Sequence, residues 1–378
     1  MTTTEVLRKK SRQRKITIQV LLVIISIIAI WGAVSSAQVN LAALGITNGF
    51  GFLDRSTGWD YSFSLVERSI NDPYSKTLVI GFQNTIFVGF ISIFFATIFG
   101  FIIGTGRDSS HPGVKAAATV FVQTFRNIPL ILQGVFLYSV LIHFPGPRQS
   151  MSFADSVFLS NRGLMLPGLN VSPSVAVALI LAIASVAVLL VWRKVPLLRG
   201  LIIWIAAAIS MSVIVAFVMR PEGEPLLSIP SLKGLRFNGG ITVSIELVAM
   251  ITAITLYGSA YIAEVVRGGL KQVPRGLIEA GQAVGLTQGQ IWHRIKMPMS
   301  LRSIIPPLGN QWIFIMKATT IGIAIGFSDM FYIVSNSITQ SGQTLELIFL
   351  LMAAFLTVNF SISIFTNWLN NRLKLKAH

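Results

Sequence analysis

Residues 261–311 read YIAEVVRGGLKQVPRGLIEAGQAVGLTQGQIWHRIKMPMSLRSIIPPLGNQ, a polar and basic stretch between two long apolar runs. Pro274 suits a first helical turn, where its missing N–H would be unpaired anyway. Gly285 suits the left-handed position after the end of that helix. Thr287 and Gln290 have the spacing of a capping box, which starts a second helix.

The second helix has a predicted end as well as a predicted start. Pro298 disfavours helical geometry at the residue before it, so we expect this helix to end at Met297. The stretch therefore predicts a helix, a glycine corner and a second helix, held at a membrane surface.

The side chains of this stretch suit contact with another protein. Ala280, Gly281 and Ala283 are small enough to let a partner approach closely. Ile291 and Ile295 lie one helical turn apart and form an apolar ridge.

The composition indicates a polytopic membrane protein, since hydrophobic residues make up 53% of the chain, charged residues 12%, and the mean hydropathy is +0.71. The net charge of +16 comes from basic residues at the ends of apolar runs. A nucleic-acid-binding protein places such residues on a folded soluble face, so we expect no nucleic-acid partner. The absence of cysteine excludes disulfides and thiolate metal sites, and the four histidines are too scattered to suggest a metal site.

Eight apolar runs are long enough to cross a bilayer, which takes about 20 residues. They are residues 16–34, 78–104, 116–143, 175–192, 201–219, 241–263, 304–327 and 345–365. With the N-terminus inside, both termini lie in the cytoplasm. The segments assigned to the inside then hold 20 Lys and Arg residues against 8 outside, as the positive-inside rule requires.

The first run has a second interpretation. Residues 1–15 are basic, and Ser35-Ser36-Ala37 could be the cleavage site of a signal peptide. The apolar core is longer than the roughly 7–15 residues of a signal, which favours a retained helix.

These runs predict five parts of the chain. They are a cytoplasmic N-terminus with the first span and a periplasmic segment (1–77), the first part of a core (78–146), an insertion with two spans (147–239), the second part of the core with its cytoplasmic loop (240–369), and a cytoplasmic tail (370–378).

Three blocks carry a resemblance to a known family. Glu279-Ala280-Gly281, Gly285, Ile295 and Pro298 resemble the "EAA" loop of ABC-importer permeases. Residues 261–269 (YIAEVVRGG) resemble the YxAExxRGG lead-in of the polar amino-acid branch, and residues 125–133 (FRNIPLILQ) are similar to its FRGTPLLVQ block. The blocks occur in the order that the family has.

This resemblance implies an all-α fold, namely a type I (MetI-like) permease core. The pair of spans at 175–192 and 201–219 is an insertion like that of the larger permease in general L-amino-acid importers. The implied complex contains a second, non-identical permease, two copies of a cytoplasmic ABC ATPase and a periplasmic amino-acid-binding protein. It lies in the lipid of the bacterial inner membrane and takes up L-amino acids.

The chain itself is not expected to be an enzyme. It has no G-x-x-x-x-G-K-[ST] phosphate cradle. The resemblance places ATP and Mg²⁺ on the partner ATPase, and no cofactor in this chain. It also implies an ATPase-coupling role for Glu279, Ala280, Gly281, Gly285, Ile295 and Pro298. Gly281 stands where the family usually has Ala, and Met297 where it has Leu.

Ionisable residues inside apolar runs are costly and mark candidate sites. Glu246 could meet the ammonium group of a solute, or lie at headgroup level and pair with a neighbour. Lys317 could attract a solute carboxylate, with hydroxyls from Thr319 and Thr320, or form a structural pair with an acid from another span. The block around Lys317 resembles the branch's K-[DN]-[ST]-[ST], with Ala318 at the second position.

Glu264 and Arg267 are spaced to pair across one helical turn where the sixth run leaves the bilayer. With Arg126 of the FRNIPLILQ block, they are candidate structural or gate residues. Two rival functions remain from the sequence: an ion-gradient-driven secondary transporter or channel, and a membrane scaffold without transport.

Overall fold

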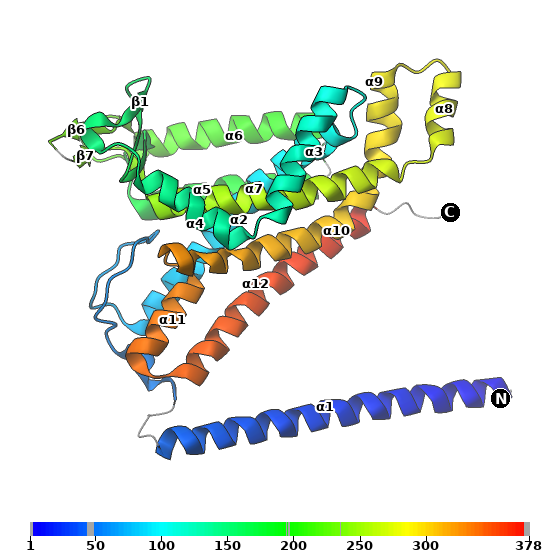
Figure 1. Ribbon diagram of the computed structural model, residues 1–378, viewed down its shortest axis with the longest axis horizontal. Coiled ribbons are helices and arrows are strands. Elements are labelled where there is room, and N and C mark those ends of the chain that lie inside the picture. Colours follow the sequence, from blue (N-terminus) through cyan, green and yellow to red (C-terminus); the bar gives the residue numbers. More distant parts are fainter. Residues whose placement is uncertain (1–2, 44–48, 194, 196, 235, 374–378) are drawn as a thin grey trace.

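The computed structural model describes residues 3–43, 49–193, 195, 197–234 and 236–373 (Figure 1). The helices are α1 Thr3–Ala43, α2 Tyr74–Arg107, α3 Pro112–Asn127, α4 Leu130–Ile142, α5 Pro173–Trp192, α6 Leu197–Val218, α7 Ile245–Lys271, α8 Arg275–Ala283, α9 Gln288–Ile291, α10 Met297–Ala318, α11 Met330–Ser341 and α12 Thr344–Leu373. The strands are β1 Met151–Phe153, β2 Val157–Ser160, β3 Gly163–Leu166, β4 Gly168–Leu169, β5 Leu227–Ser228, β6 Ser231–Lys233, β7 Arg236–Asn238 and β8 Ile241–Val243.

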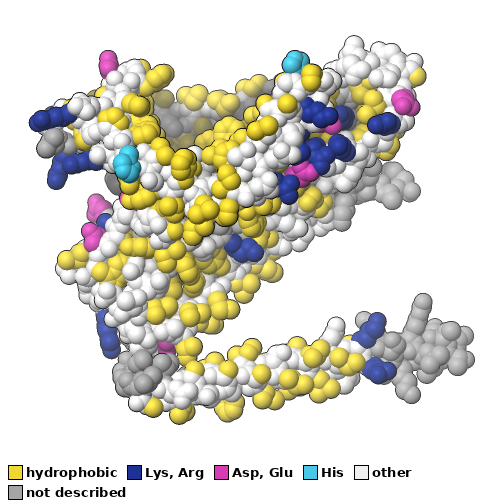
Figure 2. Space-filling model, viewed as in Figure 1, with side chains coloured by type: hydrophobic (Ala, Val, Ile, Leu, Met, Phe, Trp, Pro, Cys, Tyr) yellow, Lys and Arg dark blue, Asp and Glu magenta, His cyan; other side chains and the backbone are white. Residues whose placement is uncertain are grey.

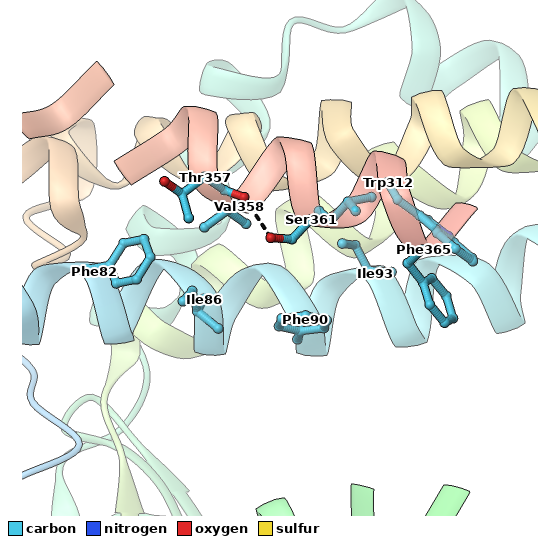
Figure 3. A pocket seen from close by; sticks show the side chains of 10 residues that line it. Phe82, Ile86, Phe90, Ile93, Trp312, Thr357, Val358, Ser361 and Phe365 are labelled. Carbon is cyan, nitrogen blue, oxygen red and sulfur yellow. Dashed lines mark hydrogen bonds between the residues drawn. The ribbon is translucent and has the colours of Figure 1, made fainter. Parts of the chain in front are cut away.

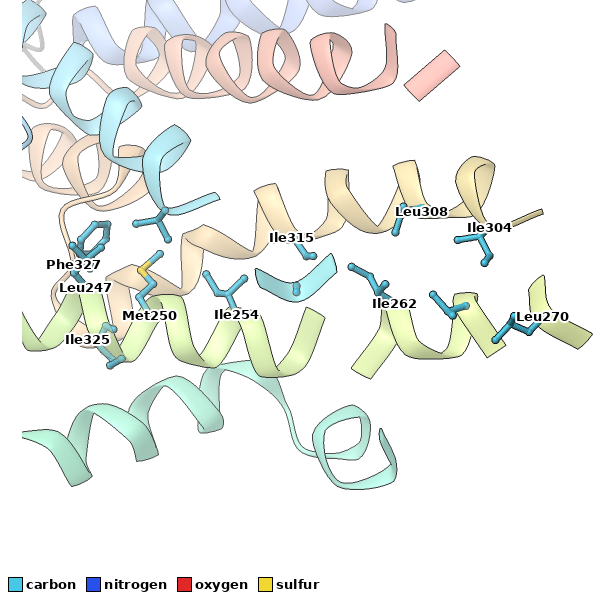
Figure 4. Packing of buried hydrophobic residues seen from close by; sticks show 14 residues of the cluster. Leu247, Met250, Ile254, Ile262, Leu270, Ile304, Leu308, Ile315, Ile325 and Phe327 are labelled. Atoms are coloured by element: carbon cyan, nitrogen blue, oxygen red, sulfur yellow. The ribbon is translucent and has the colours of Figure 1, made fainter. Parts of the chain in front are cut away.

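Helices α2 and α7 pack closely because glycines of α2 face α7. A Cβ on Gly104 would lie 2.7 Å from the carbonyl oxygen of Ala263, and one on Gly100 would lie 2.5 Å from Cγ2 of Ile262. Glycines spaced four apart let two membrane helices approach in this way. Helix α7 also packs on α10, and Figure 4 shows the shared cluster of buried side chains, which includes Ile254, Ile304, Leu308 and Ile315.

Four helices among the described residues are long and apolar enough to cross a membrane, and the number is six if each of two bent pairs counts once. The four are α1, α2, α7 and α12. Helices α5 and α6 coincide with the fourth and fifth predicted runs, but many of their side chains lie outside the described residues. The prediction of eight spans therefore stays a prediction for this pair.

The third run was predicted as one continuous helix. It forms two helices, α3 and α4, with a bend of 101° between them. The break falls at Ile128, which is extended (φ −88°, ψ 127°) because Pro129 follows it. Nε2 of Gln133 donates hydrogen bonds of 2.9 Å to the carbonyl oxygens of Phe125 and Ile128. The FRNIPLILQ block is thus a broken helix whose glutamine caps the break.

The sixth run also differs from the prediction at its start. Residues 241–243 form β8, and α7 begins only at Ile245, after Ser244 accepts a hydrogen bond of 3.3 Å from the N–H of Leu247. β8 belongs to a four-stranded antiparallel sheet of order β1-β2-β3-β8, and two further pairs are β4-β5 and β6-β7. The helical prediction is confirmed for the membrane part, whereas these strands in and beside the insertion were not predicted.

The predicted helix end at Met297 is wrong. α9 continues through a π-helical turn, Trp292–Lys296, directly into α10. The π turn is wider than an α turn, and Pro298 lies in the first turn of α10, where its missing N–H is tolerated. The seventh run then continues as a 3₁₀ helix, Thr319–Ile325, and reaches α11 with a bend of 50°.

Helices α8 and α9 lie at one end of the molecule, together with the start of α1 and the end of α12, and the strands lie at the other end (Figure 1). Hydrophobic side chains cover much of the surface between the two ends (Figure 2). A groove of about 510 Å³ lies between α2 and α12 and is lined mainly by apolar side chains such as Phe82, Phe90 and Phe365 (Figure 3). This lining suits lipid or another helix better than a charged solute.

Candidate coupling site

The corner between α8 and α9 has the predicted geometry. Gly285 has φ +82°, and two hydrogen bonds close the end of α8, from the N–H of Leu286 to the carbonyl of Gly281 (3.0 Å) and from the N–H of Gly285 to the carbonyl of Gln282 (2.9 Å). This is a Schellman motif. Both bonds of the capping box between Thr287 and Gln290 are present, at 3.3 and 2.9 Å.

Gly281 and Ile291 lie inside this corner, and Ile295 is half-buried beside them. A Cβ on Gly281 would lie 2.9 Å from Cδ1 of Ile295 and 3.3 Å from Cγ1 of Ile291. Ile291 is only 3% exposed. The expectation that Gly281 and Ile291 lie open to a partner is therefore wrong, because these residues pack α8 against α9 and fix the shape of the corner. The coupling role of Gly281 and Ile295 stays a prediction.

The outer face of the corner consists of other residues of α8 and its C-cap. Glu279, Ala280 and Ala283 are exposed, as are Leu277 (41%) and Val284 (77%). Sequence reasoning missed Val284, although an apolar residue directly before a left-handed glycine is the available signal. The exposed face therefore combines these apolar side chains with the polar or charged side chains of Arg275, Glu279 and Gln282.

Glu264 lies at the centre of a charge cluster where α2, α3 and α7 meet. Its carboxylate pairs with Arg267, as predicted, and with Arg107 of α2, which was not predicted. Nη1 of Arg126 lies 4.0 Å from Oε2 of Glu264, and the Arg126 guanidinium stacks 4.9 Å from the centre of the Tyr261 ring. The three candidate gate residues are thus brought together, and a third arginine joins them.

Asp108, the residue that directly follows α2, connects the core to the coupling corner. Its carboxylate pairs with Nζ of Lys296 in the π turn. The same ammonium group lies 5.2 Å from the centre of the Trp292 ring. Arg107 and Asp108 therefore contact α7 and the π turn side by side, which no motif in the sequence indicated.

The four candidate pathway residues do not form one cluster of contacts. Glu246 is half-buried in the first turn of α7, and Lys317 is exposed near the end of α10. Neither is in an ion pair among the described residues. Thr319 donates to the carbonyl of Met316, and Thr320 to that of Lys317, each at 3.0 Å. Thr319 is fully buried and Thr320 is half-buried, and the role of all four residues stays a prediction.

Comparison with known proteins assigns the family. The family described as "Binding-protein-dependent transport system inner membrane component" matches residues 202–375. The chain is 34% identical over 374 residues to the general L-amino acid transport system permease protein AapQ of Rhizobium johnstonii, covering 96% of this chain and 93% of that one. It belongs to the family of ABC-importer permeases.

Two further relatives extend over nearly the whole permease. It is 34% identical over 368 residues to the putative amino-acid ABC transporter permease protein YhdX of Escherichia coli, with 93% of each chain covered. It is 30% identical over 406 residues to the glutamate/glutamine/aspartate/asparagine transport system permease protein BztB of Rhodobacter capsulatus, with 97% and 95% covered. The permease is therefore a multi-pass inner-membrane component of a transporter.

Proposed function

We propose that this permease is one of two unlike membrane subunits of an ATP-driven importer for L-amino acids. A periplasmic binding protein delivers the solute, and ATP with Mg²⁺ binds to two copies of a separate ATPase. The solute class is supported by the relatives, which are named as amino-acid permeases. The observation that carries the proposal is the α8–α9 corner, whose outer face exposes the apolar side chains of Leu277 and Val284. The adjoining π turn is tied to the core by the pair between Lys296 and Asp108.

The structure suggests how the corner moves the spans. Helix α8 packs against α9 and the π turn through Gly281. Because α9, the π turn and α10 form one continuous helical rod, a force on the exposed face of α8 reaches α10 through this packing, with no loop between α9 and α10. The Asp108–Lys296 pair passes the same force to the end of α2. Closure of the ATPase subunits around nucleotide then tilts α10 and α2 together, and the two permease subunits change between outward-facing and inward-facing states.

The proposal includes an orientation in which both termini and the α8–α9 corner lie in the cytoplasm. It is supported by the Lys and Arg asymmetry of the sequence. The chain has no cysteine, so single cysteines report on sidedness. In right-side-out vesicles we expect an impermeant thiol reagent to label Glu222→Cys, which lies between α6 and β5 at the end of the molecule that carries the strands. The reagent should leave Gln282→Cys, on α8, unlabelled. The reverse pattern contradicts the proposed orientation.

Reconstitution tests the function itself. The permease is purified with its partner permease and ATPase and placed in vesicles with the binding protein and an equimolar mixture of the proteinogenic L-amino acids. We expect uptake that stops when ATP is depleted and continues with an ionophore. Uptake that survives ATP depletion and collapses with an ionophore indicates a secondary transporter instead.

A further inference from the structure

The insertion builds a small β module at the end of the molecule opposite α8 and α9 (Figure 1). We define the β module as residues 151–169 and 227–243. Its central sheet is joined to the permease core, because β8 pairs with β3 and leads through Ser244 into α7. The pairing is close: a Cβ on Gly163 would lie 2.2 Å from the carbonyl oxygen of Val243.

The β6–β7 hairpin carries charges that the fold does not require. Lys233 and Arg236 face each other across the hairpin, and both side chains are exposed. Like charges directly opposite each other destabilise an antiparallel pair. Neither residue is in an ion pair among the described residues. Figure 2 shows Lys and Arg side chains gathered over β6 and β7. The cationic tip therefore costs folding stability and needs another explanation.

Large apolar side chains lie exposed in the same module. On the edge strand β1, Phe153 is 77% exposed and Met151 is 58% exposed. The rings of Phe158 in β2 and Phe237 in β7 are in contact, with 4.9 Å between their centres, so the hairpin is held against the sheet. Aromatic residues, Met and Arg are the residues that protein interfaces favour.

We propose that the β module is the docking surface for an acidic face of the solute-binding protein. This inference rests on the proposed function, which puts the module outside the cytoplasm and supplies that partner. The cations of the hairpin attract and orient the partner, and the exposed aromatic and methionine side chains of β1 lie under it once it is docked. Because β8 continues into α7, a partner bound here bears directly on the helix whose other end holds Glu264.

An anionic lipid surface is the other partner that a cationic tip could meet. The exposed β1 edge with Phe153 and Met151 favours a protein, because it adds an apolar surface and unpaired backbone groups beside the cations. Lipid binding is kept as an outcome of the test.

The test measures ATPase activity of the complete transporter in nanodiscs as the loaded binding protein is titrated. For Lys233→Glu/Arg236→Glu we expect the half-stimulating concentration to rise about tenfold at low salt, with much less effect at high salt, because charge complementarity mainly sets association. Activity without the binding protein stays as in the wild type. Arg55→Glu, an exposed basic residue outside the module, is the matched control and leaves the titration unchanged.

A single substitution separates docking from folding. Lys233→Glu places a carboxylate opposite Arg236 and removes the like-charge pair, so it should raise thermal stability and still weaken stimulation. An unchanged half-stimulating concentration for both variants overturns the docking proposal. The proposal is also overturned if the variants lose binding to vesicles of anionic lipid while the binding protein still stimulates them as it does the wild type. That result assigns the cationic tip to lipid. If loaded binding protein does not stimulate even the wild-type transporter, the proposed function fails first.

Discussion

The two ends of α7 differ in how their charges are used. At the C-terminal end, Glu264 is shared by Arg107 and Arg267, and Arg126 lies close by. At the N-terminal end, Glu246 is in no ion pair among the described residues, and the adjoining β module carries exposed, unpaired cations.

This difference separates transmission from recognition. Charges that already have partners inside the chain hold helices together and carry force, since moving one helix drags the others. Charges without partners are available to a solute or to another protein. On this view, substitutions near the coupling corner should break transport itself, and those at the N-terminal end should change which partner is bound and how tightly.

The largest effect is expected at the corner. Gly285→Val should abolish ATP-coupled uptake while membrane insertion stays normal, because a β-branched residue is strained at φ +82°. The measurement is uptake in vesicles beside the amount of inserted complex. Gly289→Ala is the control, since Gly289 lies in α9 with open space around it and without a positive φ. Wild-type uptake by Gly285→Val contradicts the importance of the corner geometry.

The next effect concerns the charge cluster. Glu264→Gln leaves three arginines close together without their shared acid, and the cluster is only partly exposed. We expect a loss of about 2 kcal/mol of stability, between the values for exposed and buried pairs, and a marked loss of uptake. Thermal unfolding of the purified complex measures the first. Glu67→Gln, at an exposed acid with no ion pair among the described residues, should unfold like the wild type, and equal stability of both variants refutes a structural role for the cluster.

Substitutions in the Asp108–Lys296 pair, which joins the core to the corner, should have a smaller effect that is specific to coupling. Asp108→Asn and Lys296→Gln should each lower uptake several-fold while the ATPase subunits remain bound, because the force from α8 then reaches α2 less directly. The double variant should be no worse than either single variant, as expected for two residues that act through one contact. If the loss of uptake in the double variant equals the sum of the losses in the two single variants, the residues act separately.

The sequence predicts most of what depends on local rules. The left-handed glycine, the capping box and the Glu264–Arg267 pair each involve residues only a few positions apart, and each is confirmed. Glycine geometry, cap spacing and the helical repeat need no knowledge of the rest of the fold.

The features that were missed depend on long-range packing. Arg107 reaches Glu264, and Asp108 reaches Lys296, across more than 150 residues of chain. The wrong helix end at Met297 has the same origin: Pro298 is unfavourable locally, but the π turn accommodates it and keeps α9 joined to α10. The strands of the β module pair segments on either side of α5 and α6, so no short stretch of sequence shows them.

The smallest effect is expected at the N-terminal end of α7. Glu246→Gln keeps the size of the side chain and the first turn of α7, which Ser244 caps, and removes only the charge. We expect uptake to continue with a changed affinity or solute range, most clearly for basic amino acids, whose cation the carboxylate could meet. Competition by acidic, neutral and basic amino acids in vesicles measures this. If all three classes compete as in the wild type, Glu246 does not contact the solute, and its charge serves the neighbouring headgroups instead.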